Sequence, residues 1–356
     1  MNKAGAASVE FRGVTKRYGG VVAVDNVSFT IEPGKLVTLL GPSGCGKTTT
    51  LRLIAGLEMA SAGQILIGGR DVTRLSAAER DVSMVFQSYA LFPHMSVLEN
   101  AAYGPTVSGV AKQQANEMAM AKLELVGLKD FAKRLPSELS GGQQQRVAVA
   151  RALVLEPQVL LFDEPLSNLD AKLRRRVREE IRELQQSLNL TVAYVTHDQQ
   201  EALAVSDQVI VMSNARVAQI GAPRELYEQP SDLFVADFIG DANILDAEIV
   251  SLEGETCSLD VFGVQLDVPH RGVKQGLVVV AIRPEFIHLT AEPPKAQACS
   301  GIVSKASYLG PHVEYMVQCL DKSLFVVDRT SREIFRVGSE VWISIYPKGV
   351  TVVSAH

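Results

Sequence analysis

The segment GPSGCGKT at residues 41–48 constrains the fold of this chain more than any other feature. It fits the pattern G-x-x-x-x-G-K-S/T and lies between an apolar run, KLVTLL (35–40), and a helical pattern, TTTLRLIAGL (48–57). Glycines allow backbone N–H groups to turn inward around phosphate oxygens, and the helix that follows adds the positive end of its dipole. The segment therefore predicts a phosphate-binding loop between a strand and a helix.

The loop also supplies side chains suited to a nucleoside triphosphate. Lys47 is placed to reach the β- and γ-phosphates, and the Thr48 hydroxyl is placed to bind Mg²⁺. The alternative, a glycine turn with a chance lysine, is disfavoured because eight residues match in the correct structural context. The residues predicted to contact the nucleotide are Gly41, Pro42, Ser43, Gly44, Cys45, Gly46, Lys47, Thr48 and Thr49.

Two acids at the end of a buried strand complete the expected chemistry. The apolar run VLLFDEP (159–165) ends in Asp163 and Glu164. Asp163 is expected to help hold Mg²⁺, and Glu164 is then placed to polarise an attacking water. A carboxylate at a strand end can also serve only as a helix cap, but two in succession favour the catalytic role.

The hydrophobic pattern predicts two domains. Over residues 1–240, short apolar runs alternate with helical patterns, which indicates an α/β fold with a parallel sheet. Ligands of such sheets bind at the carboxyl ends of the strands. Strand signals fade between residues 95 and 135, so we expect a helical subdomain over about 88–156. From residue 241 to 356, short alternating strands separated by Gly and Pro predict a small β-barrel or sandwich.

Composition argues against several classes of protein. The net charge of −5 and the pI of about 5.8 disfavour a nucleic-acid binder. The four cysteines form no CxxC pair, which argues against a zinc site, and a cysteine inside the phosphate loop suggests a reducing compartment. No apolar run approaches the roughly 18 residues that a membrane span needs. We therefore expect a soluble chain, which is compatible with docking on a membrane protein.

The segment LSGGQQQR (139–146) points to a family. With it, the chain resembles the ATP-binding cassette (ABC) ATPases, whose signature motif it matches. The resemblance implies that small residues at a helix start present backbone N–H groups to the γ-phosphate bound by a second copy of the chain. Alone, the segment is equally consistent with a serine-capped helix that binds nothing. The signature residues are Ser140, Gly141, Gly142 and Gln143.

The remaining motifs of that family occur in the expected order. By resemblance, Tyr18 stacks on adenine, Gln87 touches Mg²⁺ and water and senses the transporter, and His197 contacts the γ-phosphate. Asp170 ends SNLD (167–170), which matches the loop that crosses to the partner subunit of a head-to-tail dimer. The predicted catalytic residues are then Glu164, His197 and Gln87, and the predicted metal-binding residues are Thr48, Gln87 and Asp163.

The resemblance covers nearly the whole chain, because the β-rich part resembles the OB-like TOBE domain of importer ATPases. It implies a Mg²⁺-dependent ATPase, bound peripherally at the cytoplasmic face of the inner membrane. Its partners would be a permease that contacts SYALFPHM (88–95) and, through it, a periplasmic or extracellular solute-binding protein. Sugars, polyamines, ferric iron and phosphonates are solutes of that subfamily. One departure is Pro105, at a position where an apolar residue is expected.

Two other functions stay open at the sequence level. One is a nucleic-acid or translation ATPase, since OB-like domains can bind oligonucleotides. Such proteins usually carry two cassettes or a long coiled coil, whereas this chain has one cassette and no heptad stretch, so we expect no nucleic-acid partner. The other is an exporter subunit, against which only the resemblance of the β-rich part argues.

Overall fold

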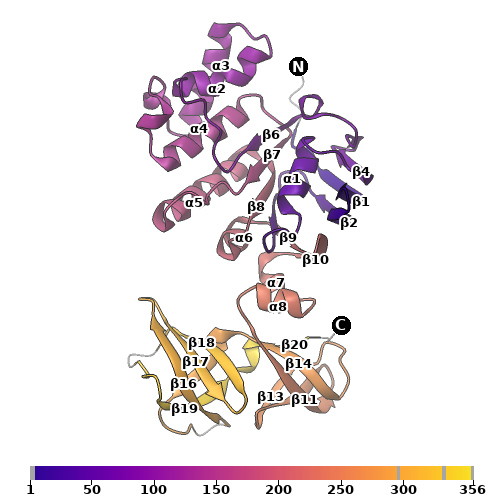
Figure 1. Cartoon of the computed structure of the whole chain (residues 1–356), viewed down its shortest axis with the longest axis vertical. Coiled ribbons are helices and arrows are strands. Elements are labelled where there is room, and N and C mark those ends of the chain that lie inside the picture. Colours follow the sequence, from indigo (N-terminus) through magenta and orange to yellow (C-terminus); the bar gives the residue numbers. More distant parts are fainter. Residues whose placement is uncertain (1–4, 295–296, 331–333, 354–356) are drawn as a thin grey trace. The chain divides into compact units, whose positions relative to one another are not determined.

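The computed structural model of the chain describes residues 5–294, 297–330 and 334–353. The chain divides into two compact units, residues 1–223 and 224–356 (Figure 1). The first unit contains α-helices and two sheets, and the second consists mainly of antiparallel strands.

A six-stranded sheet forms the centre of the first unit. Its strand order is β10-β9-β3-β8-β7-β6, and all neighbours pair in parallel except β10, which pairs antiparallel with β9. The predicted parallel sheet is confirmed. Its strands are β3 (Leu36–Leu40), β6 (Val82–Val85), β7 (Val159–Asp163), β8 (Thr191–Thr196), β9 (Gln208–Ser213) and β10 (Arg216–Gly221).

A second sheet in this unit was not anticipated from the sequence. It is antiparallel, with the order β2-β1-β4-β5, and comprises β1 (Val9–Tyr18), β2 (Val21–Ile31), β4 (Ala62–Ile67) and β5 (Arg70–Asp71). Its strands bury one face, where Phe11 and Phe29 stack with ring centroids 4.5 Å apart. A strand that buries only one face alternates apolar and polar residues, whereas a central strand is a continuous apolar run. The alternating pattern is the weaker signal, so this sheet is harder to recognise in a sequence.

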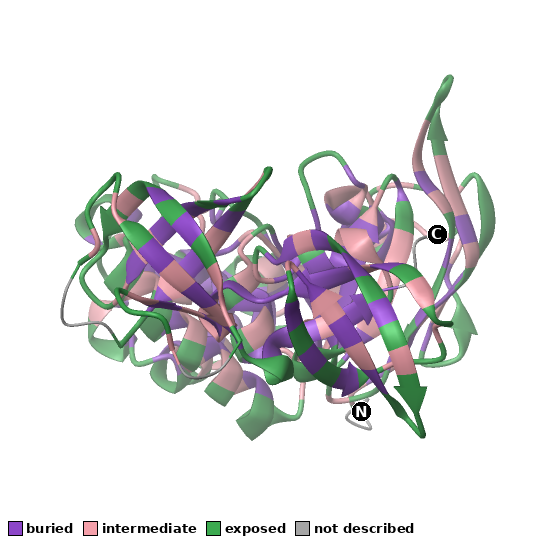
Figure 2. Ribbon diagram, turned by 90° about the horizontal axis from the view of Figure 1, so that it is seen from below, coloured by how far each residue is buried: buried purple, intermediate pink, exposed green. Residues whose placement is uncertain are grey.

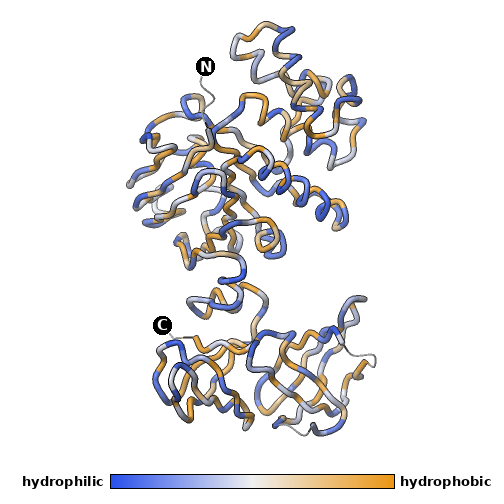
Figure 3. Tube along the Cα trace, turned by 180° about the vertical axis from the view of Figure 1, so that it is seen from behind, coloured by the Kyte–Doolittle hydropathy of each residue, from blue (hydrophilic) through white to orange (hydrophobic). Residues whose placement is uncertain are grey.

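Helices cover both faces of the six-stranded sheet. One face packs on α1 (Lys47–Ala55) and on the antiparallel sheet, and the other packs on α4 (Gly141–Leu153) and α5 (Ala171–Leu188). The short helix α6 (Gln199–Val205) follows β8. In Figure 3, blue hydrophilic turns alternate with orange along α5, whose buried residues Val177 and Ile181 lie on one side.

The predicted helical subdomain contains α2 (Val97–Val107) and α3 (Lys112–Leu125), which pack with α4 around a separate apolar cluster. Pro105 is buried inside α2 and does not end it, because the helix continues to Val107. A proline this close to a helix end removes only one backbone hydrogen bond of the last turns. The departure from the family pattern therefore leaves the helix intact.

The second unit contains two five-stranded antiparallel sheets around a shared apolar core. Buried and exposed residues alternate along its strands, as the purple and green bands of Figure 2 show. The first sheet has the order β13-β12-β11-β14-β20, with β11 (Asn243–Glu253), β12 (Thr256–Val261), β13 (Val264–Pro269), β14 (Gly276–Ile282) and β20 (Val350–Val353). The second has the order β15-β19-β16-β17-β18, with β15 (Ile287–Thr290), β16 (Cys299–Tyr308), β17 (Val313–Cys319), β18 (Lys322–Asp328) and β19 (Glu340–Ile345).

The division at residue 224 lies earlier than the predicted domain boundary at 240/241. The buried guanidinium of Arg283 explains the difference, because it donates to the backbone carbonyls of Tyr227, Ala236 and Ile239. These bonds tie α7 (Pro223–Glu228) and α8 (Leu233–Phe238) to the β-rich unit. No local pattern in residues 224–240 indicated this attachment.

Candidate nucleotide-binding and hydrolysis site

The phosphate loop connects the end of β3 to the start of α1, as predicted. Gly46 is the N-cap of α1 with φ of 103°, and a side chain there would collide with the Ala23 carbonyl. The ammonium of Lys47 is buried within the loop and donates to the Gly41 and Pro42 carbonyls, each at 2.8 Å. The loop thus surrounds a cation at a helix N-terminus, which is an arrangement suited to phosphate.

Thr48 and Asp163 meet between α1 and β7. The Thr48 hydroxyl donates to Asp163 Oδ1 at 3.4 Å. Burial raises the pKa of the Asp163 carboxyl, the nearby Arg52 lowers it and Glu164 raises it again. Two oxygen ligands fit Mg²⁺, which is usually held by one or two protein groups together with substrate phosphates. Within residues 5–294, 297–330 and 334–353, no cluster of three or more His, Cys, Asp or Glu side chains is arranged to bind a metal without a nucleotide.

Glu164 and His197 lie side by side because β7 and β8 are neighbouring parallel strands. Glu164 Oε2 is 3.1 Å from His197 Nδ1, and the Glu164 N–H donates to the Val195 carbonyl of β8. The backbone of Glu164 has a φ of 45°, in the left-handed region that residues other than Gly, Asn and Asp rarely adopt. Such backbone strain is common where a functional side chain must be aimed.

Gln87 contacts the loop that was predicted to cross to a partner subunit. Its side-chain Nε2 donates to Ser167 Oγ at 3.2 Å, and its backbone carbonyl accepts from Asn168 Nδ2 at 3.0 Å. Ser167 Oγ in turn donates to the Glu164 carbonyl. The structure therefore joins Gln87 to Glu164 through one serine.

Tyr18 is the last residue of β1 and is 44% exposed. The Lys16 ammonium lies over its ring, 4.7 Å from the ring centroid. Burial, together with the nearby Glu58 carboxylate, raises the pKa of the phenol, and the nearby Thr49 hydroxyl lowers it in part. Since Thr49 directly follows the phosphate loop, the ring of Tyr18 lies near that loop.

Ser140 and Asp170 are both helix N-caps. Ser140 Oγ accepts from the Gln143 N–H at 3.4 Å while Gln143 Oε1 accepts from the Ser140 N–H at 2.9 Å, forming a capping box at the start of α4. Asp170 Oδ1 accepts from the Lys172 and Leu173 N–H groups at the start of α5. The capped-helix alternative is thus realised within one chain, and a ligand role for these residues depends on a second one.

A buried carboxylate behind His197 was not predicted from the sequence. Glu201 accepts from the hydroxyls of Thr196 and Tyr194 at 2.8 and 3.2 Å, and Arg174 lies 3.8 Å away. Burial raises the pKa of the Glu201 carboxyl. Its spacing of four residues after His197 was the available signal, but its burial is a product of the fold.

Arg151 was also missed, although it interrupts the apolar stretch VAVARALVL. Its guanidinium donates to the Tyr89 and Ala90 carbonyls at 2.8 and 2.7 Å. Tyr89 and Ala90 both have positive φ, 62° and 49°, in the segment directly after Gln87. Arg151 therefore holds an unfavourable backbone conformation against α4.

A strand, a phosphate loop and a helix, with two acids on the next strand but one, define a phosphate-loop nucleoside triphosphatase. Residues 24–167 match the ABC transporter family, and residues 280–353 match the TOBE domain. The chain belongs to the ABC transporter ATPases. It is an ATP-binding, ATP-hydrolysing subunit with a C-terminal TOBE domain.

Relatives extend this likeness over the full length. The chain is 55% identical over 354 residues to "Fe(3+) ions import ATP-binding protein FbpC 1" of Rhizobium meliloti (strain 1021), covering 99% of this chain and 100% of the relative. It is 56% identical to FbpC of Brucella abortus (strain 2308), with 98% of each chain covered. A solved structure described as the dimeric bacterial ABC transporter cassette MJ0796 is 31% identical, with a TM-score of 0.54, and covers 61% of this chain and 99% of its own.

Proposed function

We propose that this chain drives the uptake of ferric iron as the ATPase subunit of an importer. The observation that carries the proposal is the identity of 55–56% to ferric iron import proteins over essentially the whole of both chains, the β-rich unit included. Among sugars, polyamines, phosphonates and ferric iron, this likeness favours ferric iron. The same likeness disfavours an exporter, because these relatives are named as import proteins. A nucleic-acid function is disfavoured because the part of the chain that could bind oligonucleotides matches the TOBE domain.

We infer that the working form is a head-to-tail homodimer, as the likeness to a cassette described as dimeric supports. In that arrangement, Ser140, Gly141, Gly142 and Gln143 of one copy face the γ-phosphate held by Lys47 of the other. Asp170 begins α5 beside that interface. ATP then stabilises the closed dimer, because it binds the closed dimer more tightly than the open one.

Hydrolysis depends on positioning and on charge stabilisation. Lys47 and the loop N–H groups bind the β- and γ-phosphates, and Tyr18 stacks on the adenine. Thr48, Asp163 and Gln87 would hold Mg²⁺, which neutralises phosphate charge when bound. Glu164 orients and deprotonates the attacking water, and His197, in contact with Glu164, holds that carboxylate and the transferred phosphoryl group.

The proposed partners are a membrane permease, contacted by residues 88–95, and a periplasmic or extracellular solute-binding protein that reaches this chain only through the permease. None of the helices in the described part of the chain is long and apolar enough to span a bilayer. From the likeness to import ATP-binding proteins, we propose that the chain binds peripherally at the cytoplasmic face of the inner membrane.

The catalytic assignment is tested with Glu164→Gln. We expect turnover to fall by roughly 10²- to 10⁴-fold and an ATP-bound dimer to accumulate in gel filtration, because binding persists without a general base. Glu179→Gln, a change at an exposed carboxylate of α5, is the matched control and should behave as the wild type. A Glu164→Gln chain that stays monomeric and hydrolyses ATP normally would falsify the assignment.

The solute is tested separately with the complete transporter. The tagged chain is purified with the membrane proteins that accompany it and reconstituted with the solute-binding protein. We expect ferric-loaded binding protein to stimulate the ATPase, and spermidine or a phosphonate to leave it at the basal rate. Stimulation by a polyamine or phosphonate, but not by ferric iron, would overturn the ferric assignment without touching the catalytic one.

A further inference from the structure

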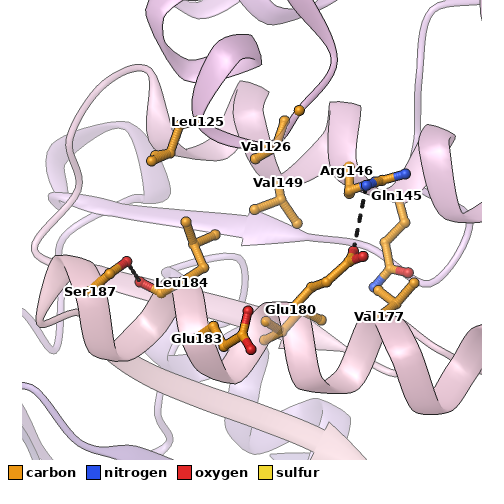
Figure 4. Close-up of a pocket in the computed structure, with 12 residues that line it drawn as sticks. Leu125, Val126, Gln145, Arg146, Val149, Val177, Glu180, Glu183, Leu184 and Ser187 are labelled. Atoms are coloured by element: carbon orange, nitrogen blue, oxygen red, sulfur yellow. Dashed lines mark hydrogen bonds and ion pairs between the residues drawn. The ribbon is translucent and has the colours of Figure 1, made fainter.

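The first unit contains a cavity away from the nucleotide-binding residues. Its volume is about 490 Å³, and it lies between the end of α3 and the helices α4 and α5 (Figure 4). Its walls combine polar and aliphatic side chains, and the aliphatic ones include Val126 from the end of α3, Val149 from α4, and Ile181 and Leu184 from α5. This volume falls within the range of about 300–1,000 Å³ that is typical of small-molecule sites.

One polar side chain in this cavity lacks the partners it needs. Gln145, on α4, is 0% exposed, and neither its amide nitrogen nor its amide oxygen forms a hydrogen bond in the described chain. Leaving a buried donor or acceptor unpaired costs about 1–3 kcal/mol. The neighbouring glutamines do not share this feature: Gln144 donates to the Pro136 and Leu139 carbonyls, and the buried Gln185 donates to the Gly34 and Leu190 carbonyls.

Two charged groups line the same wall. Arg146 Nη1 lies 3.7 Å from Glu180 Oε2, which is too far for a hydrogen bond, and the buried Arg146 Nε and Glu180 Oε2 have no hydrogen-bond partner. Glu183 also lines the cavity, so carboxylates outnumber the single arginine. An anion is therefore disfavoured there, whereas a neutral group that donates and accepts hydrogen bonds is favoured.

A water molecule does not account for the whole space. Water pairs well with a buried amide, but it needs two to four polar partners, and half of the residues that line this cavity are aliphatic. A ligand that fills it needs an apolar body together with a polar edge. A carboxamide pairs best with another N–H/C=O edge, because each donates to and accepts from the other.

We propose that this cavity is a binding site for a small uncharged molecule with an apolar or aromatic body and an amide-type edge, which pairs with the side chain of Gln145. The site is built from α4 and α5, the helices that begin at Ser140 and Asp170. Gln145 and Arg146 end the signature segment 139–146, but the cavity uses none of the residues assigned to the nucleotide.

Benzamide is the probe, since it combines an aromatic ring with a primary amide. We expect it to bind the full chain with a Kd of about 1 mM in a ligand-observed NMR titration, given its size. Acetophenone lacks the N–H donor and benzoate is an anion, so both should bind at least tenfold more weakly. Saturating ADP should leave benzamide binding unchanged, and displacement by ADP would assign benzamide to the adenine site and overturn the proposal.

Variants locate the site. Gln145→Leu keeps the volume but removes the amide, and should weaken benzamide at least tenfold while the chain still melts cooperatively. Ser187→Trp places a large ring at the exposed rim of the cavity on α5 and should also weaken binding. Gln186→Trp, at the preceding position and outside the lining, should not weaken binding. Equal binding by all three variants, or a crystal soaked in benzamide that shows only water on Gln145, would overturn the proposal.

Discussion

The two halves of the proposed ATP site are built in different ways. Around the phosphate loop, side chains from α1 and from the ends of β7 and β8 contact one another within one chain, as in the Thr48–Asp163 and Glu164–His197 pairs. At the starts of α4 and α5, Ser140 and Asp170 contact only the first turn of their own helices in the hydrogen bonds that the structure assigns to their side chains. The first half is assembled by the fold, and the second is a pair of helix caps that gain a further role only in a dimer.

The largest expected effect comes from separating the two halves by mutation. Lys47→Ala and Ser140→Arg should each lower the ATPase rate of their own homodimer by at least about 100-fold, because each damages both sites of the dimer. Mixing the two variants should restore about one quarter of the wild-type rate, because a mixed two-fold dimer has one intact site. The measurement is the steady-state ATPase rate of the mixture.

The double variant provides the control for this mixing experiment. A chain that carries both Lys47→Ala and Ser140→Arg, mixed with the wild type, forms mixed dimers in which each site has one defect. Those dimers should be inactive. If the single-variant mixture recovers nothing, both halves of a site come from one chain and not from two.

A smaller effect is expected for Arg151 of α4, which contacts the segment after Gln87 within the same chain. Arg151→Met removes the charged hydrogen bonds to the Tyr89 and Ala90 carbonyls and leaves two residues of positive φ without that support. The free energy of unfolding in urea should fall by about 2 kcal/mol. Arg175→Met, at an arginine whose side chain is 76% exposed, should change it by less than about 0.5 kcal/mol. Equal losses in the two variants would show that the Arg151 contacts contribute nothing specific.

The smallest effect concerns pH. Because burial raises the pKa of Glu201, the folded chain holds this proton more tightly than the unfolded chain does. Between the ordinary pKa of a glutamate and the raised value, stability therefore falls as pH rises. Glu201→Gln has no such proton, so its stability relative to the wild type should increase from pH 4 to pH 7 in urea denaturation. The exposed Glu179→Gln variant should differ from the wild type by the same free energy of unfolding at every pH. The same constant difference for Glu201→Gln would show that Glu201 does not hold its proton more tightly in the folded chain.

Much of the fold was predictable because its signals are local. The strands β3, β7, β8 and β9 are short apolar runs, and the predicted parallel sheet is confirmed. The glycine-rich loop was located for the same reason. The antiparallel sheet was missed, since strands with one buried face give a weaker pattern, and the attachment of residues 224–240 was missed because it depends on Arg283, far along the chain. The roles of the individual site residues remain predictions that the variants above test.

By itself, the sequence determined which groups are available for ATP chemistry and in what order, from the loop at 41–48 to His197, because loop conformation and helix capping depend on neighbouring residues. Only the tertiary structure decided how distant groups meet. It placed Gln87 against Ser167, buried Glu201 beneath His197, set Arg151 against the segment after Gln87, and left Gln145 unpaired in a cavity. These are contacts between separate elements, and their geometry depends on how sheets and helices pack, which no local pattern specifies.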